Sequence, residues 1–385
     1  MKRTDTILII ILFVLLTACA GNKQSNDGLI IVDVSKSYPQ KELILQDFMD
    51  VEYIPLETSD ELVTQGLVQD VGKEYLLLKN RNSDGDIFIF DRKTGRGIRK
   101  INRQGQGPEE YTRINDIVLD ESNGEIFVKS QGNKIVVYDL YGTFKRALNL
   151  GREVSSVFDY DKHHLICYDM SDYHNKGEDR SKSYHIILSK QDGSITREIF
   201  VPFKTVNTPI VNQGDGFVAN YSYQIRLSNG KWTLIETSAD TLYNYTPDGT
   251  LTPFIVRVPS INTMKPEVFL YMGIHTDRYY FIQTVKNVFD VEKGRGFYTD
   301  ELMYDKAEKA IFRTTVYNGD YAEKRPVAMT AQSINREIEY ATSLNAFQLV
   351  EIYEKGQLKE GKLKEIASML NEEDNPVIML VKQKK

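Results

Sequence analysis

The sequence is short of cysteine, tryptophan and histidine, and these shortages exclude several kinds of site. Its 385 residues include two cysteines, Cys19 and Cys167, one tryptophan and five histidines. Cys19 stands directly after a predicted export signal, and Cys167 is the other cysteine, so the mature chain is expected to form neither an intrachain disulfide nor a cysteine metal cluster. The histidines do not stand at metal-ligand spacing, and the pair His163-His164 falls in a predicted turn.

Catalytic signatures and long runs of basic residues are also missing. The chain has no Gly-x-Ser-x-Gly elbow, no His-Glu-x-x-His zinc helix and no phosphate-binding P-loop. Its net charge is −6 and its basic residues are dispersed, which argues against a nucleic-acid partner. These absences favour a binding protein over an enzyme.

The N-terminus carries an export signal that ends in a cysteine. Two basic residues precede an apolar stretch from Ile7 to Leu16, which is shorter than the roughly 20 residues of a membrane-spanning helix. The sequence Leu-Thr-Ala-Cys that ends at Cys19 resembles the bacterial lipobox, in which the cysteine is lipidated and becomes the new N-terminus. We therefore predict a lipoprotein signal peptide, a flexible polar tether and a folded domain, at residues 1–18, 19–37 and 38–385.

A strand–turn–strand phrase recurs five times at a slowly growing spacing. In the first copy the run Ile-Phe-Ile-Phe-Asp at residues 87–91 precedes a turn with Gly95. The glycines of the next three turns are Gly142, Gly193 and Gly249, at spacings of 47, 51 and 56 residues. A repeated unit of this size is typical of stacked blades or solenoid coils.

The flanks of each phrase extend it to a four-stranded antiparallel meander with tight turns. The five units cover residues 68–102, 114–150, 155–201, 209–258 and 268–317. Strand-like segments at 43–56 and 376–381 have no blade of their own, and pairing them would complete a sixth blade and close a ring. We therefore predict an all-β, six-bladed propeller. Apolar residues at near-helical spacing between Asn345 and Glu373 predict a short helical insertion packed on its rim.

The segment 103–111, Arg-Gln-Gly-Gln-Gly-Pro-Glu-Glu-Tyr, resembles the Gly-x-Gly-Pro-Gly-Glu-Tyr stretch of the six-bladed β-propeller lipoproteins of Bacteroidetes, relatives of the NHL-type propellers. The ending 372–377 also resembles their closing strand. The resemblance covers nearly all of the mature chain and implies the same fold in a family largely of unknown function. Glu109 stands where the family carries its third glycine, so a left-handed backbone is not expected there.

The repeated unit becomes longer along the chain because one class of connection between its strands becomes longer. The connections between the second and third strands lengthen along the chain, at residues 80–86, 131–134, 169–183, 221–240 and 284–300. In an up-and-down blade these turns emerge on the same side as the crossovers between blades. Insertions gathered on one face commonly mark a binding side, which predicts a ligand site there; the alternative is that the loops are tolerated decoration or cover strand edges.

Aromatic, arginine and acidic side chains in these loops and in the 103–113 crossover are the ligand-binding candidates. They are Arg103, Glu110, Tyr111, Arg113, Tyr173, His174, Arg180, Tyr223, Arg226, Trp232, Arg295 and Tyr298. Aromatic faces beside arginines suit stacking and bidentate hydrogen bonds, as a glycan or peptide requires. Alternatively, the 103–111 stretch shapes the crossover, with Tyr111 capping the core and Arg103 pairing with Glu110.

Three functions remain open on the sequence. The first is a membrane-anchored envelope module that binds a glycan or peptide, and the second is a scaffold that docks another envelope protein. The third is a Ca²⁺-dependent, lactonase-like hydrolase with a metal in the central channel, near Asn115, Asp116 and Asp159. No cofactor other than this possible Ca²⁺ is expected. In this phylum surface-exported lipoproteins carry an acidic run after the lipidated cysteine, and residues 20–24 lack one, which favours a periplasm-facing anchor on the outer membrane.

Overall fold

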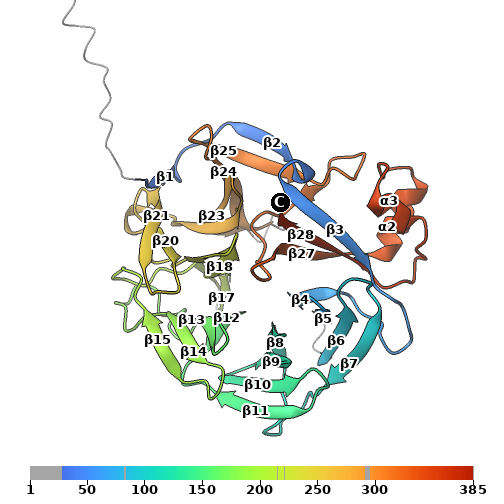
Figure 1. The fold of residues 1–385 in the computed structure, drawn as a ribbon. Coiled ribbons are helices and arrows are strands. Elements are labelled where there is room, and N and C mark those ends of the chain that lie inside the picture. Colours follow the sequence, from blue (N-terminus) through green and yellow to red (C-terminus); the bar gives the residue numbers. More distant parts are fainter. Residues whose placement is uncertain (1–27, 82–83, 215, 221, 291–294, 385) are drawn as a thin grey trace, which may run out of the picture.

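Six β-sheets stand around a central channel in the computed structural model, which describes residues 28–384 apart from 82–83, 215, 221 and 291–294. The chain is a six-bladed β-propeller, as predicted (Figure 1). The predicted signal peptide and the predicted lipidation site, Cys19, lie outside the described residues. None of the described helices is long and apolar enough to span a membrane.

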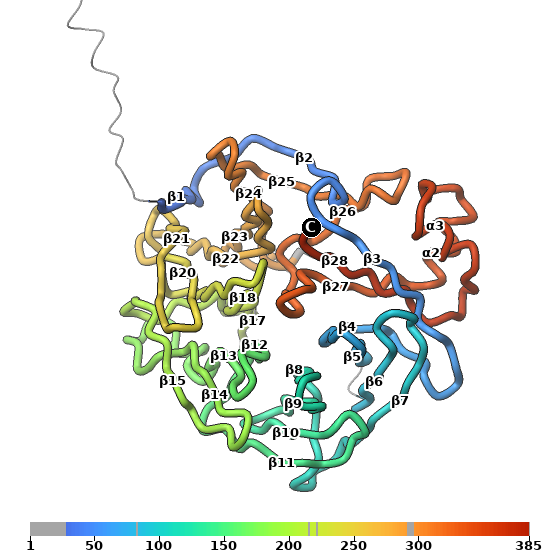
Figure 2. The backbone as a smooth tube through the Cα atoms, in the orientation of Figure 1, coloured from blue at the N-terminus to red at the C-terminus, as the bar shows by residue number. Residues whose placement is uncertain are grey.

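Blades 1 to 3 each have the predicted pattern of four antiparallel strands. Blade 1 consists of β4 (Leu67–Val71), β5 (Tyr75–Lys79), β6 (Asp86–Asp91) and β7 (Gly97–Asn102). Blade 2 consists of β8 (Ile114–Asp120), β9 (Glu125–Ser130), β10 (Lys134–Asp139) and β11 (Phe144–Asn149). Blade 3 consists of β12 (Val154–Asp159), β13 (His164–Asp169), β14 (His185–Ser189) and β15 (Ile195–Ile199). The first strand of each blade lines the channel and the fourth forms the outer wall (Figure 2).

Blades 4 and 5 each gain a fifth, parallel strand from the N-terminal segment. Blade 4 consists of β18 (Ile225–Ser228), β19 (Lys231–Leu234), β20 (Thr241–Tyr245), β21 (Leu251–Val258) and the added β1 (Ile30–Asp33). Blade 5 consists of β22 (Val268–His275), β23 (Tyr279–Asp290), β24 (Arg295–Asp305), β25 (Ala310–Tyr317) and the added β2 (Gln40–Ile44), with β26 (Pro326–Val327) also on β25. Two 3-10 turns lie at Leu45–Asp47 and Ile261–Thr263. β1 thus orders part of the segment predicted to be tether, because its backbone completes the edge of β21.

The predicted fourth unit begins too early. The strands β16 (Ile210–Gln213) and β17 (Gly216–Ala219) pair as a separate hairpin, and the predicted connection 221–240 contains the two inner strands of the blade. Asn229 and Gly230 both have positive φ, 47° and 67°, which fits a tight hairpin turn between β18 and β19. All four residues of β18 are buried whereas those of β16 are partly exposed, so β18 takes the inner position.

Blade 6 closes the ring with strands from both ends of the chain. It consists of β27 (Ile338–Leu344), β28 (Val377–Gln383) and β3 (Met49–Pro55). β28 pairs antiparallel with β3 from Val377 opposite Pro55 to Gln383 opposite Met49, which confirms the predicted composite blade. β3 is the outer, fourth strand of this blade, so β28 corresponds to a third strand and β27 to a second strand. The irregular segment before β27 takes the position that a first strand has in the other blades.

The recurring turn glycines lie where one blade touches the next. Gly95, Gly142, Gly193 and Gly249 all have positive φ, between 71° and 94°. A Cβ on the first three would lie 1.9 Å from the carbonyl oxygen of Pro55, 2.9 Å from Ile101 and 2.9 Å from Leu148 respectively. Each of these contacts belongs to the outer strand of the preceding blade. The repeated phrase is therefore a blade-to-blade contact as well as a turn.

The predicted helical insertion is present between β27 and β28, as α2 (Ala346–Glu354) and α3 (Lys362–Ala367). Leu349 and Ile366 are buried against a core that includes Met379 of β28. The insertion forms two short helices because Gly356 and Gly361, both at positive φ, separate them. It packs on the rim of the propeller, as expected (Figure 1).

Candidate functional site

Three insertions over blades 3, 4 and 5 join into one surface, here called the long-loop platform: the described residues of 170–184, 208–220 and 286–298. The Tyr173 hydroxyl donates to the carbonyl of Asn220 at 2.6 Å, which ties the blade 3 loop to the β16–β17 hairpin. Asn287 Nδ2 donates to the carbonyl of Ile210 at 3.2 Å and ties the same hairpin to β23. The β16–β17 hairpin belongs to the crossover between blades 3 and 4, on the side where the second-to-third connections emerge. The insertions therefore share one face.

Aromatic side chains are exposed on this platform. The rings of His174 and Phe217 lie 4.9 Å apart, and Phe217 is 53% exposed. Tyr298 is 38% exposed, and its hydroxyl donates to Asp290 at 2.9 Å. The Arg180 guanidinium stacks 3.9 Å from the ring centre of Phe200 and donates to the carbonyl of Val201, so it stiffens the base of the platform. The side chain of Arg295, at the start of β24, lies outside the described part of the structure.

Four predicted site residues are buried structural groups. Tyr173 is a clamp within the platform rather than part of its surface. Trp232 lies in β19, not in a loop, and its ring packs against Phe158 and Tyr160 between blades. Arg226 lies in β18 with its Nη1 donating to the carbonyl of Ala331. Tyr111 is fully buried. Arg226 and Trp232 were placed in a loop because the fourth unit was predicted to begin too early. Tyr111 and Tyr173 were placed on the surface because a sequence alone does not distinguish a buried tyrosine from an exposed one.

The 103–113 crossover has the structural role that the sequence offered as an alternative. The Tyr111 hydroxyl donates to the carbonyl of Gly85 and accepts from the backbone N–H of Arg103, and Tyr111 caps the core between blades 1 and 2. Glu110 and Arg103 have other partners than each other: Glu110 accepts from Gly107 N–H at 2.8 Å, and Arg103 Nε donates to Gly142 at 3.1 Å. Arg113 is exposed near the channel mouth, where its charge acts on Lys79.

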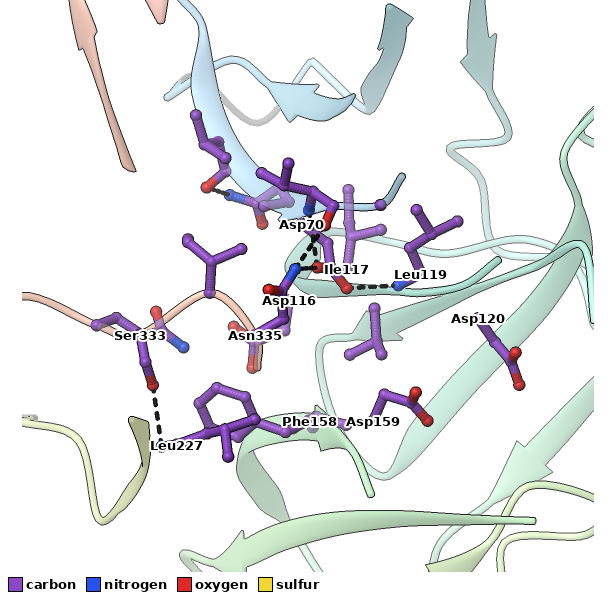
Figure 3. A pocket seen from close by; sticks show the side chains of 18 of the residues that line it. Asp70, Asp116, Ile117, Leu119, Asp120, Phe158, Asp159, Leu227, Ser333 and Asn335 are labelled. Atoms are coloured by element: carbon purple, nitrogen blue, oxygen red, sulfur yellow. Dashed lines mark hydrogen bonds between the residues drawn. The ribbon is translucent and has the colours of Figure 1, made fainter. Parts of the chain in front are cut away.

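A cavity of about 530 Å³ occupies the central channel beside the platform (Figure 3). The inner strands β4, β8 and β12 line it, with Tyr223 before β18 and residues 332–337 before β27. Of the predicted ligand-binding residues, Tyr223 lines this cavity, and it is 39% exposed. Because each inner strand is the end of its sheet, unpaired backbone groups face the channel.

Residues 331–337, here called the channel segment, run across this channel in place of a first strand of blade 6. Ser333 Oγ accepts from the backbone N–H of Leu227 in blade 4 at 3.1 Å. Asn335 Nδ2 donates to Asp70 Oδ1 in blade 1 at 3.2 Å, and Arg336 Nη2 donates to the carbonyl of Tyr160 in blade 3 at 2.7 Å. The segment thus connects three blades by side-chain hydrogen bonds, of which Figure 3 shows the one between Ser333 and Leu227.

Two inner-strand aspartates line the cavity, Asp70 in blade 1 and Asp116 in blade 2. Asp70 accepts from the backbone N–H of Leu119 in the next blade at 2.8 Å, and Asp116 accepts from the backbone N–H of Val157 in the blade after. Burial raises the pKa of Asp70 to about 6 and also raises that of Asp116. Asp70 was missed in the sequence, although the similar Gln-Asp-Val and Asn-Asp-Ile phrases around the two residues signal it.

Another carboxylate that lines the cavity is Asp159, at the end of β12. Its Oδ1 lies 2.6 Å from Nζ of Lys190, which also pairs with Asp120 at 2.5 Å. Burial nonetheless raises the pKa of Asp159. Among the described residues no group of three or more histidine, cysteine, aspartate and glutamate side chains is placed to hold a metal ion.

The ring of six β-sheet blades around a lined channel defines the class: a six-bladed β-propeller. Residues 20–342 match the family DUF5128, described as a 6-bladed β-propeller, and the chain belongs to that family. The chain is similar to two solved structures. A Bacteroides fragilis protein described as exported is 16% identical, with a TM-score of 0.59 over 93% of this chain and 100% of that one. A DUF4221 member from Bacteroides vulgatus is 12% identical, with a TM-score of 0.47 over 87% and 97%. Among curated proteins, none matches the chain.

Proposed function

We propose that the protein is a cell-envelope binding module that holds a glycan or a peptide on the long-loop platform. The observation that carries this proposal is the exposure of Phe217, His174 and Tyr298 on insertions that hydrogen bonds tie together. Exposed rings held on a rigid base offer a flat apolar surface with polar edges at low entropic cost. A sugar ring or a peptide side chain stacks on such a surface and hydrogen-bonds at its rim.

Removing either exposed ring should weaken binding without affecting the fold. We expect Phe217→Ala and Tyr298→Ala each to weaken binding about tenfold or more, because each ring lies on the surface and supports little of the core. The measurement is the dissociation constant of the full-length chain for solubilised envelope glycans and for a peptide library. Phe347→Ala and Tyr141→Ala are matched controls, since these rings are 51% and 73% exposed away from the platform.

Two other outcomes of that experiment would change the proposal. If the platform variants retain full affinity, or lose no more than the controls, the platform is not the binding surface. If neither glycans nor peptides bind but an envelope protein co-purifies and is lost in Phe217→Ala, the module is a scaffold for that protein.

The membrane anchor is the second part of the proposal. β1 leaves the ring at the outer rim of blade 4 (Figure 1), and the stretch between Cys19 and Gly28 spans at most roughly 30 Å when extended. A lipid on Cys19 would therefore hold the propeller by its rim, close to the outer membrane, with the platform free. The similar Bacteroides fragilis protein described as exported supports the envelope location.

Replacing the predicted lipidation site tests the anchor. We expect Cys19→Ser to move the protein from the membrane fraction to the soluble fraction, because no described helix would hold it there. The measurement is the distribution of the protein after cell fractionation, with Cys167→Ser as the control for loss of a thiol. A Cys19→Ser protein that stays in the membrane fraction would contradict the anchor.

A further inference from the structure

An apolar groove of about 480 Å³ lies on the outer rim of the propeller, between blades 4 and 5. β1 and the end of β21 form one wall, and the end of β24 and the start of β25 form the other. Its lining includes Ile30, Ile31, Val258, Tyr304 and Ile311. Ile31 is 45% exposed and Val258 is 36% exposed, so apolar surface faces solvent at the place where the N-terminal segment joins the ring (Figure 1).

The fold fixes the position of this apolar surface. Ile30, Tyr304 and Ile311 pack against the hydrophobic core between blades 4 and 5, so the floor of the groove continues that core. Side chains alternate along β1: Val32 is fully buried, and Ile31, the residue before it, therefore points outward. β1 pairs with β21 over all four of its residues, which holds Ile31 in this position.

The groove lies beside the point where the chain arrives from the predicted lipid anchor. β1 is parallel to β21, with Asp33 opposite Val258. β21 is the fourth strand of blade 4 and runs toward the crossover face, which carries the long-loop platform. Gly28 therefore lies at the end of β1 that points to the opposite face. The stretch from Cys19 to Gly28 spans at most roughly 30 Å, so a lipid on Cys19 keeps a membrane close to the groove.

Basic side chains flank the groove. Lys36 and Lys309 line it, and both are exposed. The carboxylate among the lining residues is that of Asp33, which accepts from the Ser35 hydroxyl at 2.6 Å and lies 3.2 Å from Nζ of Lys36. Its charge is therefore met at the edge of the groove. An apolar surface with basic side chains at its margin suits the boundary between phospholipid headgroups and acyl chains.

We propose that this groove, here called the rim groove, rests on a phospholipid membrane surface and turns the long-loop platform away from it. The proposal rests on the lipid anchor of the proposed function, because the apolar patch is too small to hold the protein at a membrane alone. The anchor keeps the rim groove at a high local concentration of lipid, and a weak contact is then enough to set one orientation.

Quenching by brominated lipid tests the contact. The full-length lipidated chain is reconstituted in vesicles of phosphatidylethanolamine and phosphatidylglycerol, with and without bromine on the acyl chains. The variant Ile31→Trp places a fluorescent ring in the rim groove, and Trp232, which is 2% exposed, supplies a constant background. We expect bromine to remove about half or more of the emission that Ile31→Trp adds, because a tryptophan at a membrane interface lies next to the acyl chains.

Matched variants locate the contact. Tyr141→Trp places the same ring at a 73% exposed position on blade 2, across the ring from blade 5, and should keep its emission. Val258→Asp, added to Ile31→Trp, puts a carboxylate in the apolar patch and should restore most of the emission. Val63→Asp makes the same change at a 62% exposed position between blades 6 and 1 and should restore none. Equal quenching of Ile31→Trp and Tyr141→Trp, or unchanged quenching after Val258→Asp, would overturn the proposal.

The same samples separate failure of the rim contact from failure of the anchor. Flotation with the vesicles reports the anchor: a chain that floats but shows no quenching of Ile31→Trp keeps the anchor and contradicts the rim contact. A chain that does not float contradicts both. Dimers of the wild type in detergent that Val258→Asp abolishes would identify the rim groove as an interface between copies of the chain, and would also contradict the proposal.

Discussion

Gly95→Ala should lower the free energy of unfolding by about 4 kcal/mol. Two costs add. The backbone of Gly95 has φ of 71°, which costs a residue with a Cβ roughly 1 to 2 kcal/mol. The new Cβ would also lie 1.9 Å from the carbonyl oxygen of Pro55, so the turn of blade 1 must move away from the closing blade, at a cost of roughly 1 to 3 kcal/mol. Urea unfolding followed by circular dichroism measures the change.

Gly124→Ala separates the two costs. Gly124 has φ of 63°, and nothing lies within 4 Å of the position of its Cβ. We therefore expect a loss of only about 1 to 2 kcal/mol, from the backbone alone. Similar losses for the two variants would show that the recurring glycine is a turn residue and not a blade-to-blade contact.

Glu236→Gln should make the protein more stable at neutral and alkaline pH, by up to about 3 kcal/mol at pH 8. Glu236 is 2% exposed, accepts from the Tyr168 hydroxyl and from Ser238 N–H, and burial raises its pKa to about 7. The folded protein therefore holds a proton on Glu236 that the unfolded chain releases above pH 4.5. The stability that this carboxyl contributes is present below pH 4.5 and is lost as the pH rises to 7.

The wild-type pH profile hides this loss, because His185 acts in the opposite direction. Burial lowers the pKa of His185 to about 4, so its contribution to stability grows as the pH rises from 4 to 6.5. The difference in unfolding free energy between Glu236→Gln and the wild type removes the histidine contribution. That difference should grow from pH 4.5 to pH 7 and then stay constant.

The glutamine can keep both hydrogen bonds of the carboxyl, with its oxygen on Ser238 N–H and its amide on the Tyr168 hydroxyl. Glu373→Gln, at an exposed position, is the control for loss of a negative charge. A difference between Glu236→Gln and the wild type that does not change with pH would mean that Glu236 is ionised in the folded protein.

The fold was readable from sequence because its repeated turns need particular residues. A glycine at positive φ between two apolar runs has few alternatives, so the phrases around Gly95, Gly142 and Gly193 located the blades. Blade 4 was misplaced because the hairpin at 210–219 alternates like an inner strand pair. The difference between that hairpin and β18 is burial, which depends on neighbours far away in the chain.

The candidate site was less predictable, for the same reason. The loops over blades 3 to 5 were expected on one face. Phe217 also lies on this face, next to His174, but the two residues are far apart in the sequence, so their contact could not be predicted. Tyr111 and Trp232 are of residue types that often bind ligands, but both are buried in the core. The channel carboxylates Asp70 and Asp116 repeat in sequence, but two copies of a three-residue phrase are too few to stand out.

The route of the N-terminal segment determines when the ring can close. β1, β2 and β3 all lie before residue 56, yet they pair in blades 4, 5 and 6 with strands that begin after residue 225. Synthesis supplies these partners last, since the chain is made from its N-terminus. The first strands therefore wait unpaired while blades 1 to 3 form, and β3 docks only after β28 has been made. This order delays the complete fold until nearly all of the chain has been made.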